Sequence, residues 1–262
     1  MKSLKSSKPM NGAAVRCDRV TKRFYYYTHR TESLRELFIR SVRRQPPDIR
    51  RAEFTLKAFS LSVAPGESVA LIGSNGSGKS TALRLMAGVY RPTTGTVETH
   101  GRVAAVIELG AGFHPELTGA ENVALYGAVM GLTRAEIQVR FEDIVSFADI
   151  GKFIDIPVKY YSSGMQARLA FAVTVCVEPE ILLLDEVLAV GDESFRQRCL
   201  DRLAAFHAAG GTLIVVSHDL ESVSQLCSRA VWLEHGVVRM SGDVEAVTKA
   251  YRASLEEAGH GH

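Results

Sequence analysis

Residues 68–80 read Ser-Val-Ala-Leu-Ile-Gly-Ser-Asn-Gly-Ser-Gly-Lys-Ser, and this stretch decides the fold. Its first five residues predict a short buried strand, and the next eight match the phosphate-binding pattern G-x-x-x-x-G-K-[ST] at every fixed position. Leu83, Met86 and Ala87 then recur at helical spacing. Because the glycine-rich loop joins a strand to a helix, as phosphate binding by this motif requires, an ordinary glycine-rich turn is the weaker interpretation.

The loop offers a phosphate group several kinds of favourable contact. Its glycines let backbone N–H groups converge on phosphate oxygens, the following helix contributes its positive N-terminus, and Lys79 supplies a mobile cation. Ser80 offers its hydroxyl to Mg²⁺. The sequence therefore predicts a nucleotide-binding segment that comprises Gly73, Ser74, Asn75, Gly76, Ser77, Gly78, Lys79, Ser80 and Thr81.

Composition places the chain among globular proteins. With 262 residues and 46% hydrophobic content, we expect one large α/β domain or one domain with a subdomain. No run of about 18 apolar residues is present, so the chain is not expected to span a bilayer alone. The basic, polar N-terminus lacks the apolar region of a secretory signal, which favours the cytoplasm. The four cysteines are widely spaced and predict core side chains, and a net charge of +2 does not indicate nucleic acid binding.

The chain divides into one main domain and two short ends. We expect residues 1–13 to be flexible, residues 14–252 to form the domain, and residues 253–262 to form a C-terminal tail. Within the domain, residues 28–53 form an insert with an amphipathic helical pattern and several arginines. A solvated basic surface helix is the plain interpretation of this insert.

Two capping boxes predict a helical subdomain at about 114–175. Thr118 and Thr133 each precede a glutamate by three residues, and each pair opens a helical pattern. Before this region, residues 96–107 follow the phosphate-loop helix and predict a β-hairpin. After it, strand-like and helical runs alternate, which indicates a mainly parallel sheet; they lie at 181–184, 193–208, 212–216 and 230–233.

Two of these strands end in side chains that suit phosphate chemistry. Residues 181–184 are apolar and run into Asp185 and Glu186, at the strand edge where ligands bind in open α/β sheets. Asp185 suits Mg²⁺ coordination, and Glu186 is placed to take a proton from the water that attacks a γ-phosphate. His218, after the strand at 212–216, is placed to reach the same phosphate. Without the phosphate loop, a solvated strand end and a structural histidine would be the better interpretations.

Residues 160–166, Tyr-Tyr-Ser-Ser-Gly-Met-Gln, precede another helical stretch. Ser162 or Ser163 is expected to cap this helix. A serine hydroxyl, exposed N–H groups and a helix dipole also make an anion site, although an ordinary N-cap has the same sequence signature.

In order and spacing, the phosphate loop, Ser-Ser-Gly-Met-Gln, Leu-Leu-Leu-Asp-Glu and Ser-His-Asp together resemble an ABC-type ATPase subunit over about residues 14–252. The resemblance implies a P-loop NTPase (RecA-like) fold: a mainly parallel sheet with an inserted helical subdomain and an antiparallel β portion. It implies hydrolysis of ATP with Mg²⁺, with Lys79, Glu186 and His218 as catalytic residues and Ser80 and Asp185 at the metal.

The family also implies a head-to-tail homodimer with two ATP molecules between the chains. The signature residues would then contact ATP on the partner's phosphate loop; they are Ser162, Ser163, Gly164, Met165 and Gln166. Gly191 and Asp192 would lie in the segment that crosses the dimer interface, and Phe24 would stack on adenine. The tyrosine run at 25–27 leaves the choice of aromatic open.

Two departures from the common sequence pattern of ABC ATPases indicate one group within that family. The signature reads Tyr-Ser-Ser-Gly-Met-Gln where most members have Leu-Ser-Gly-Gly-Gln, and the loop at 108–119, which begins with Glu108, contains no glutamine. Both variants resemble the exporters of bacterial surface polysaccharides: capsule, O-antigen and teichoic acid. This implies a lipid-linked polysaccharide as cargo and a multi-helix membrane permease, in two copies, as partner. It also implies a peripheral place on the cytoplasmic face of the inner membrane, with the insert near the channel mouth.

Three alternatives stay open from the sequence. The same motor chemistry could drive another cargo, as in importers and drug exporters. A soluble ABC ATPase that acts on nucleic acid or ribosomes usually carries a coiled-coil insertion or two motor copies, and neither is visible. A GTPase or small-molecule kinase shares the phosphate loop, but the guanine-binding tetrapeptide Asn-Lys-x-Asp is absent from the sequence.

Overall fold

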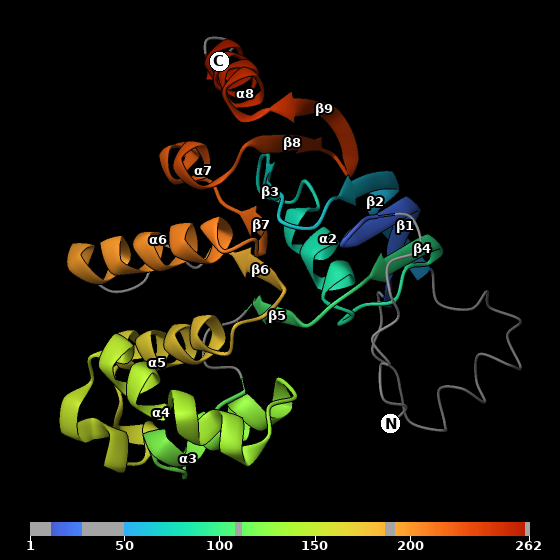
Figure 1. Cartoon of the computed structure of the whole chain (residues 1–262). Coiled ribbons are helices and arrows are strands. Elements are labelled where there is room, and N and C mark those ends of the chain that lie inside the picture. The colour runs from blue at the N-terminus through green and yellow to red at the C-terminus, as the bar shows by residue number, and fades with distance from the viewer. Residues whose placement is uncertain (1–11, 28–49, 108–111, 187–191, 260–262) are drawn as a thin grey trace, which may run out of the picture.

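A computed structural model describes residues 12–27, 50–107, 112–186 and 192–259. Two sheets and a set of helices make up this part of the chain (Figure 1). Most of the predicted insert, residues 28–49, lies outside the described residues, and so does nearly all of the expected flexible N-terminus.

The larger sheet is mainly parallel, which confirms that prediction. Its six strands lie in the order β5-β6-β7-β3-β8-β9; the first five are parallel and β9 is antiparallel to β8. Strands β3, β6 and β7 are almost fully buried, so their sequences are continuous apolar runs. The strands are β3 (Ser68–Ile72), β5 (Val103–Val106), β6 (Ile181–Asp185), β7 (Thr212–Val216), β8 (Arg229–Glu234) and β9 (Val237–Asp243).

The smaller sheet supplies the antiparallel portion. It has the order β2-β1-β4, with β1 (Val15–Tyr27), β2 (Arg50–Val63) and β4 (Thr94–Thr99) all antiparallel to their neighbours. Helix α2 (Lys79–Met86) follows the phosphate loop, and its buried side chains share one apolar cluster with both sheets. The helix is therefore enclosed, and the loop at its N-terminus is held from both sides.

The remaining helices cover the other face of the larger sheet and extend beyond it. Helices α3 (Gly119–Val129), α4 (Arg134–Ala148) and α5 (Ser163–Cys176) gather in a lobe at one side of the sheet (Figure 1). Short 3-10 turns at Gly151–Asp155 and Val158–Tyr160 connect α4 to α5. Helices α6 (Glu193–Ala208), α7 (Leu220–Leu226) and α8 (Val244–Gly259) complete the chain, and side chains from the helices and the sheet form one apolar cluster.

Local signals placed the helix starts correctly. Both capping boxes form: Thr118 accepts from the Glu121 N–H and Thr133 from the Glu136 N–H, and each glutamate side chain bonds back to its threonine N–H. These reciprocal bonds satisfy N–H groups that the first turn leaves free.

The predicted hairpin at 96–107 is wrong. Strand β4 pairs with β1 in the smaller sheet, whereas β5 pairs with β6 in the larger one. Between them, the Arg102 N–H donates to the Glu180 carboxylate and the Arg102 carbonyl accepts from the Ile181 N–H, so the chain crosses to the edge of the larger sheet. At the other end of the domain, α8 continues to Gly259, so residues 253–259 of the expected tail are helical.

The cysteines and the helices bear on two further expectations. All four cysteines are buried and free of disulfides, as predicted, and burial raises the pKa of the Cys17, Cys199 and Cys227 thiols to about 12. None of the helices in the described ranges combines the length and apolarity that a membrane crossing requires.

Candidate nucleotide-binding site

The site residues meet where neighbouring strands of the larger sheet end. Strands β6, β7 and β3 are adjacent, and each C-terminal end carries one of the predicted motifs. A cavity of about 420 Å³ opens there. It is lined by Thr55, Asn75, Gly76, Gly78, Lys79, Ser80, Thr81, Ile107, Asp185 and Glu186. The structure therefore brings the phosphate loop and the two carboxylates together around one space.

The glycines of the phosphate loop are required by close backbone approaches. Gly73 has φ +143°, and a Cβ on it would lie 2.1 Å from the Leu233 carbonyl oxygen of β8. Gly78 has φ +107°, and its Cβ would lie 2.5 Å from the Thr55 carbonyl oxygen of β2. Both positions exclude any side chain, so the loop is fixed between the ends of the two sheets.

Lys79 and Ser80 place a cation and a hydroxyl at the start of α2. The Lys79 ammonium donates to the carbonyl oxygens of Gly73 and Ser74 at 2.8 and 3.0 Å, and it lines the cavity. Burial lowers its pKa, against the attraction of Glu186 and Asp185. The loop thus holds the cation beside the space that a phosphate group would fill.

The hydroxyl of Ser80 donates to Asp185 Oδ1 at 3.0 Å, across two elements far apart in sequence. Burial raises the pKa of Asp185, because it disfavours the charged form, and a bound cation would stabilise the carboxylate. One hydroxyl and one carboxylate beside a phosphate site are the donors that Mg²⁺ takes from a protein, since it keeps waters and phosphate oxygens as its other ligands. The residues present therefore fit a magnesium ion bound together with nucleotide.

Glu186 lines the same cavity, and His218 lies beside Glu186. Glu186 adopts φ +53°, and its N–H donates to the Val216 carbonyl of β7, which turns the chain out of the sheet. Glu186 Oε1 is 3.6 Å from His218 Nδ1. Both side chains are exposed, by 45% and 71%, so they remain accessible to water and to a phosphate group.

The signature residues lie apart from this cavity in the same chain. Ser162 caps α5, because its hydroxyl accepts from the Met165 N–H, and Ser163 is the first helical residue. This settles which of the two serines is the cap. None of the residues 162–166 lines the cavity at the phosphate loop.

Residues 56–189 match the sequence profile of the family described as ABC transporter. The chain belongs to the ABC transporter family. It is 46% identical over 236 residues to the "O-antigen export system ATP-binding protein RfbB" of Klebsiella pneumoniae, a match that covers 90% of this chain and 96% of the relative.

A second relative of this ABC chain is the "Teichoic acids export ATP-binding protein TagH" of Levilactobacillus brevis. It is 43% identical over 242 residues, which cover 92% of this chain and 65% of that protein. Among solved structures, a dimeric, post-hydrolysis state of the ATP-binding cassette MJ0796 bound to ADP and Pi superposes with a TM-score of 0.70. At 23% identity, over 88% of this chain and 98% of that one, it confirms the P-loop NTPase fold. The chain is an ABC ATPase.

Other predicted positions of this ABC ATPase are only partly described. The Phe24 ring packs edge-on against Tyr90, with centroids 5.4 Å apart, and Lys22 Nζ lies 5.0 Å from the Phe24 centroid. Neither ring lines the cavity, so adenine stacking by Phe24 stays a prediction, and half of the Tyr25 side chain is exposed. Asp192 caps α6. Gly191 and Glu108 lie outside the described residues.

Several residues around the site belong to no sequence motif and were not predicted. Thr55 and Ile107 line the cavity without belonging to any motif, and Tyr90 joins Phe24 from the end of the α2 segment. Alternation in the strand-like stretches at 54–63 and 96–107 was the only available signal. It indicates strands, but it does not say which end of a strand meets the phosphate loop.

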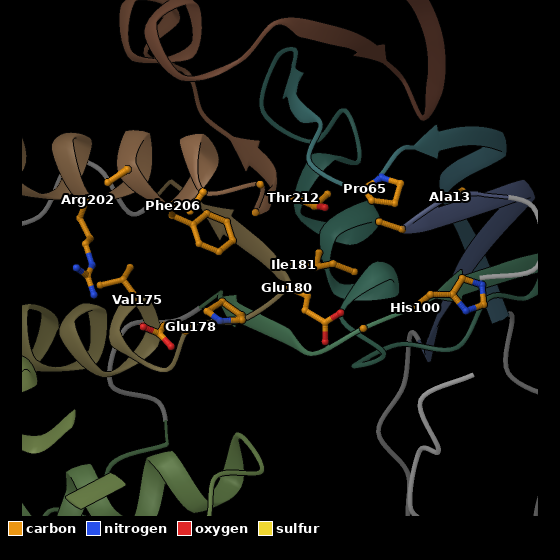
Figure 2. Close-up of a pocket in the computed structure, with 17 residues that line it drawn as sticks. Ala13, Pro65, His100, Val175, Glu178, Glu180, Ile181, Arg202, Phe206 and Thr212 are labelled. Carbon is orange, nitrogen blue, oxygen red and sulfur yellow. The ribbon is translucent and has the colours of Figure 1, made fainter. Parts of the chain in front are cut away.

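A larger cavity, of about 700 Å³, lies at the opposite edge of the sheet. Figure 2 shows Arg202 and Phe206 of α6 on one side of it and His100 on the other. It contains none of the motif residues. Of these two cavities, the smaller one is the candidate nucleotide site, because it combines a phosphate loop, a cation and carboxylates at the C-terminal strand ends.

Proposed function

We propose that this ABC ATPase is the motor subunit of an exporter that moves a lipid-linked surface polysaccharide, of capsule or O-antigen type, across the cytoplasmic membrane. The observation that carries the motor role is the contact of Ser80 with Asp185, at 3.0 Å, beside the phosphate loop and next to Glu186. The cargo is inferred from similarity, since the relatives named above are ATP-binding proteins of O-antigen and teichoic acid export.

The polar groups of the phosphate loop and of the neighbouring strand ends each have a proposed task in ATP hydrolysis. The loop N–H groups and Lys79 bind the phosphates, and Ser80 and Asp185 would hold Mg²⁺, which supplies neutralising charge to the β- and γ-phosphates. Glu186 accepts a proton from the attacking water, because its carboxylate is exposed at the open side of the cavity. His218, 3.6 Å from Glu186, contacts the γ-phosphate and orients that carboxylate.

The separation of Ser162 from the phosphate loop supports a two-chain site. The helix that Ser162 caps has a hydroxyl and free N–H groups at its N-terminus, which suit a phosphate group, yet they do not line the cavity of their own chain. A second copy, arranged head to tail, would supply them. ATP then stabilises the closed pair by its differential affinity, and hydrolysis reopens it.

The membrane partner is inferred from similarity to the export proteins named above. Two copies of a multi-helix permease in the membrane would carry the polysaccharide path, and two copies of this chain would bind them from the cytoplasmic side. The chain itself would be peripheral to the membrane, and no nucleic acid partner is proposed.

Substitution Glu186→Gln tests the motor. We expect ATP binding to persist and turnover to fall about 100- to 10,000-fold, the usual contribution of a general base. The matched control is Glu178→Gln: Glu178 has a similar backbone conformation (φ +49° against +53°) but lies before β6, at the opposite edge of the sheet. Normal hydrolysis by purified Glu186→Gln protein would refute the base assignment.

The cargo is tested in cells from which this chain has been deleted. We expect lipid-linked polysaccharide to accumulate inside, and the wild-type chain but not Glu186→Gln to restore surface polymer. Unchanged surface polymer after deletion would refute polysaccharide export while leaving the ATPase assignment intact. Co-purification with nucleic acid or ribosomes instead of a membrane protein would favour the soluble alternative.

A further inference from the structure

Two arginines lie over a buried aromatic ring where three helices meet. The Cζ atoms of Arg168, on α5, and Arg198, on α6, lie 4.9 and 5.3 Å from the ring centroid of Phe195. Phe195 is fully buried and packs against Phe147 of α4 and Phe171 of α5. The ring therefore gives both guanidinium groups the same support.

The two arginines differ in their acidic partners. Both contact Asp149, the C-cap of α4, at 3.6 Å from Arg168 and 3.2 Å from Arg198. Only Arg168 also reaches Asp192, with Nη2 2.7 Å from Oδ2. A planar guanidinium makes these contacts at once, with one nitrogen to each carboxylate and its face on the ring, whereas an ammonium has no such fork.

Asp192 is fixed on its other side by the start of α6. Its Oδ1 accepts from the Phe195 N–H at 2.9 Å and from the Ser194 hydroxyl at 2.8 Å. These bonds, followed by the charge of Arg168, lower the pKa of Asp192, so the carboxylate stays ionised. One residue thus caps α6 with one oxygen and binds α5 with the other.

The ion pair joins the signature helix, which the proposed function places at the partner copy, to the Asp192 segment, which the family resemblance places at the dimer interface. Arg168 lies six residues after Ser162, about 9 Å along the same helix from the signature cap. Asp192 lies six residues after Glu186, the proposed base. Within the described residues, the ion pair is thus a direct link between the signature helix and the start of α6.

We propose that Arg168 is a positioning residue for nucleotide-driven dimerisation. It holds the signature end of α5 and the Asp192 end of α6 in one fixed relation, so that both dock on the second copy together. This inference rests on the proposed function, because it needs the two-chain site. Arg168 does not line the nucleotide cavity. Its side chain is 18% exposed and that of Asp192 is 61% exposed, so solvent screens the pair on the aspartate side and limits its contribution to the stability of a lone chain.

The test compares Arg168→Met with Arg198→Met in the full chain carrying Glu186→Gln. Arg198→Met removes contacts with Phe195 and Asp149 but leaves the Asp192 pair intact, which makes it the matched control. Dimer dissociation constants are measured at saturating ATP by light scattering, together with the affinity of lone chains for a fluorescent ATP analogue. Because each dimer contains the pair twice, we expect Arg168→Met to weaken the dimer about 5- to 30-fold, with lone-chain affinity unchanged.

A double-mutant cycle separates positioning from a direct role of Asp192. Asp192→Asn keeps the helix cap and removes the charge, since asparagine caps helices as well as aspartate does. We expect it to weaken the dimer like Arg168→Met, and the double variant to be little worse than either. Arg168→Lys should restore only part of the loss. If Arg168→Met does not fold, the Asp192→Asn and Arg168→Lys chains carry the same comparison.

Two results would overturn the inference alone: an Arg168→Met dimer as tight as that of Arg198→Met, or effects of Arg168→Met and Asp192→Asn that simply add. A Glu186→Gln parent that forms no dimer with ATP would instead overturn the two-chain site, and this inference with it. The parent chain thus distinguishes the two failures.

Discussion

A methyl group at Gly236 should weaken ATP binding from behind the phosphate loop. Gly236 lies in the turn between β8 and β9, with φ +80°. Its N–H donates to the Ser77 carbonyl at 3.0 Å, and its carbonyl accepts from the Lys57 N–H at 2.8 Å. A Cβ on Gly236 would lie 2.7 Å from the Thr55 carbonyl oxygen. The turn is therefore wedged between β2 and the phosphate loop, with no room for a side chain.

The magnitude follows from two contributions. An alanine with this backbone conformation costs about 1–2 kcal/mol. The close contact adds about 1–3 kcal/mol, because the turn or β2 must move. Displacing the turn breaks its bond to Ser77, which is worth about 0.5–1.5 kcal/mol, so the Kd for ATP should rise about 2- to 13-fold.

Gly131→Ala is the matched control. Gly131 has φ +89°, but a Cβ there would meet no atom within 4 Å, and its turn follows α3, away from the nucleotide cavity. It should lose only the backbone contribution, with unchanged ATP affinity. Melting curves give stability, at about 2–4 °C per kcal/mol, and titration calorimetry of the Glu186→Gln background gives affinity. Equal ATP affinities for Gly236→Ala and Gly131→Ala would refute the proposed support of the loop.

Two further substitutions test a half-buried carboxylate and a buried amide. Asp185→Asn should abolish turnover yet raise the melting temperature of the nucleotide-free protein at neutral pH, because burial raises the pKa of Asp185 and its charge opposes folding. The free-energy cost of a charged Asp185 is absent below about pH 4 and grows as the pH rises through the folded pKa. The wild type should therefore lose stability relative to Asp185→Asn over that range. A variant that is less stable than the wild type at pH 7 would contradict the view that this charge opposes folding. Asn122→Ala should destabilise the protein by about 1–3 kcal/mol, since the buried Asn122 side chain accepts from the His114 N–H at 2.7 Å and nothing replaces it. An unchanged melting curve would show that the loop before α3 re-pairs its backbone.

The sequence predicted secondary structure best where one signal sufficed. A continuous apolar run predicted β7, and a helical run ended by Gly210 predicted α6, with their observed bounds. The Thr118 box works in the same way, because an N-cap and a glutamate three residues later satisfy each other within one turn. These features depend on neighbours in sequence, so no knowledge of the fold is needed.

Strand partners could not be predicted in this way. The stretch at 96–107 alternates equally well as a hairpin or as two strands of different sheets. Its second half pairs with β6, whose residues lie more than 70 positions later, through the Arg102 and Glu180 contacts. Pairing energy is shared by many backbone groups, so no single residue marks the partner.

The same distinction separates the residues of the candidate site that the sequence predicts from those that it does not. Groups that touch phosphate must be particular residue types at fixed spacing, so Lys79, Ser80 and Asp185 are visible as motifs. The groups that support the site act largely through backbone atoms or through pairs far apart in sequence. Gly236 bonds to the backbone of the phosphate loop, and Arg168 binds Asp192 at the start of α6. Many sequences could provide such support, which leaves no pattern to find. In the proposed dimer, this support would set how strongly ATP binding is coupled to the rest of each chain, because a ligand shifts a conformational equilibrium only by its differential affinity for two defined states. A chain that keeps every motif but loses these supporting contacts would therefore bind and hydrolyse ATP with little coupling between the signature helix and the start of α6.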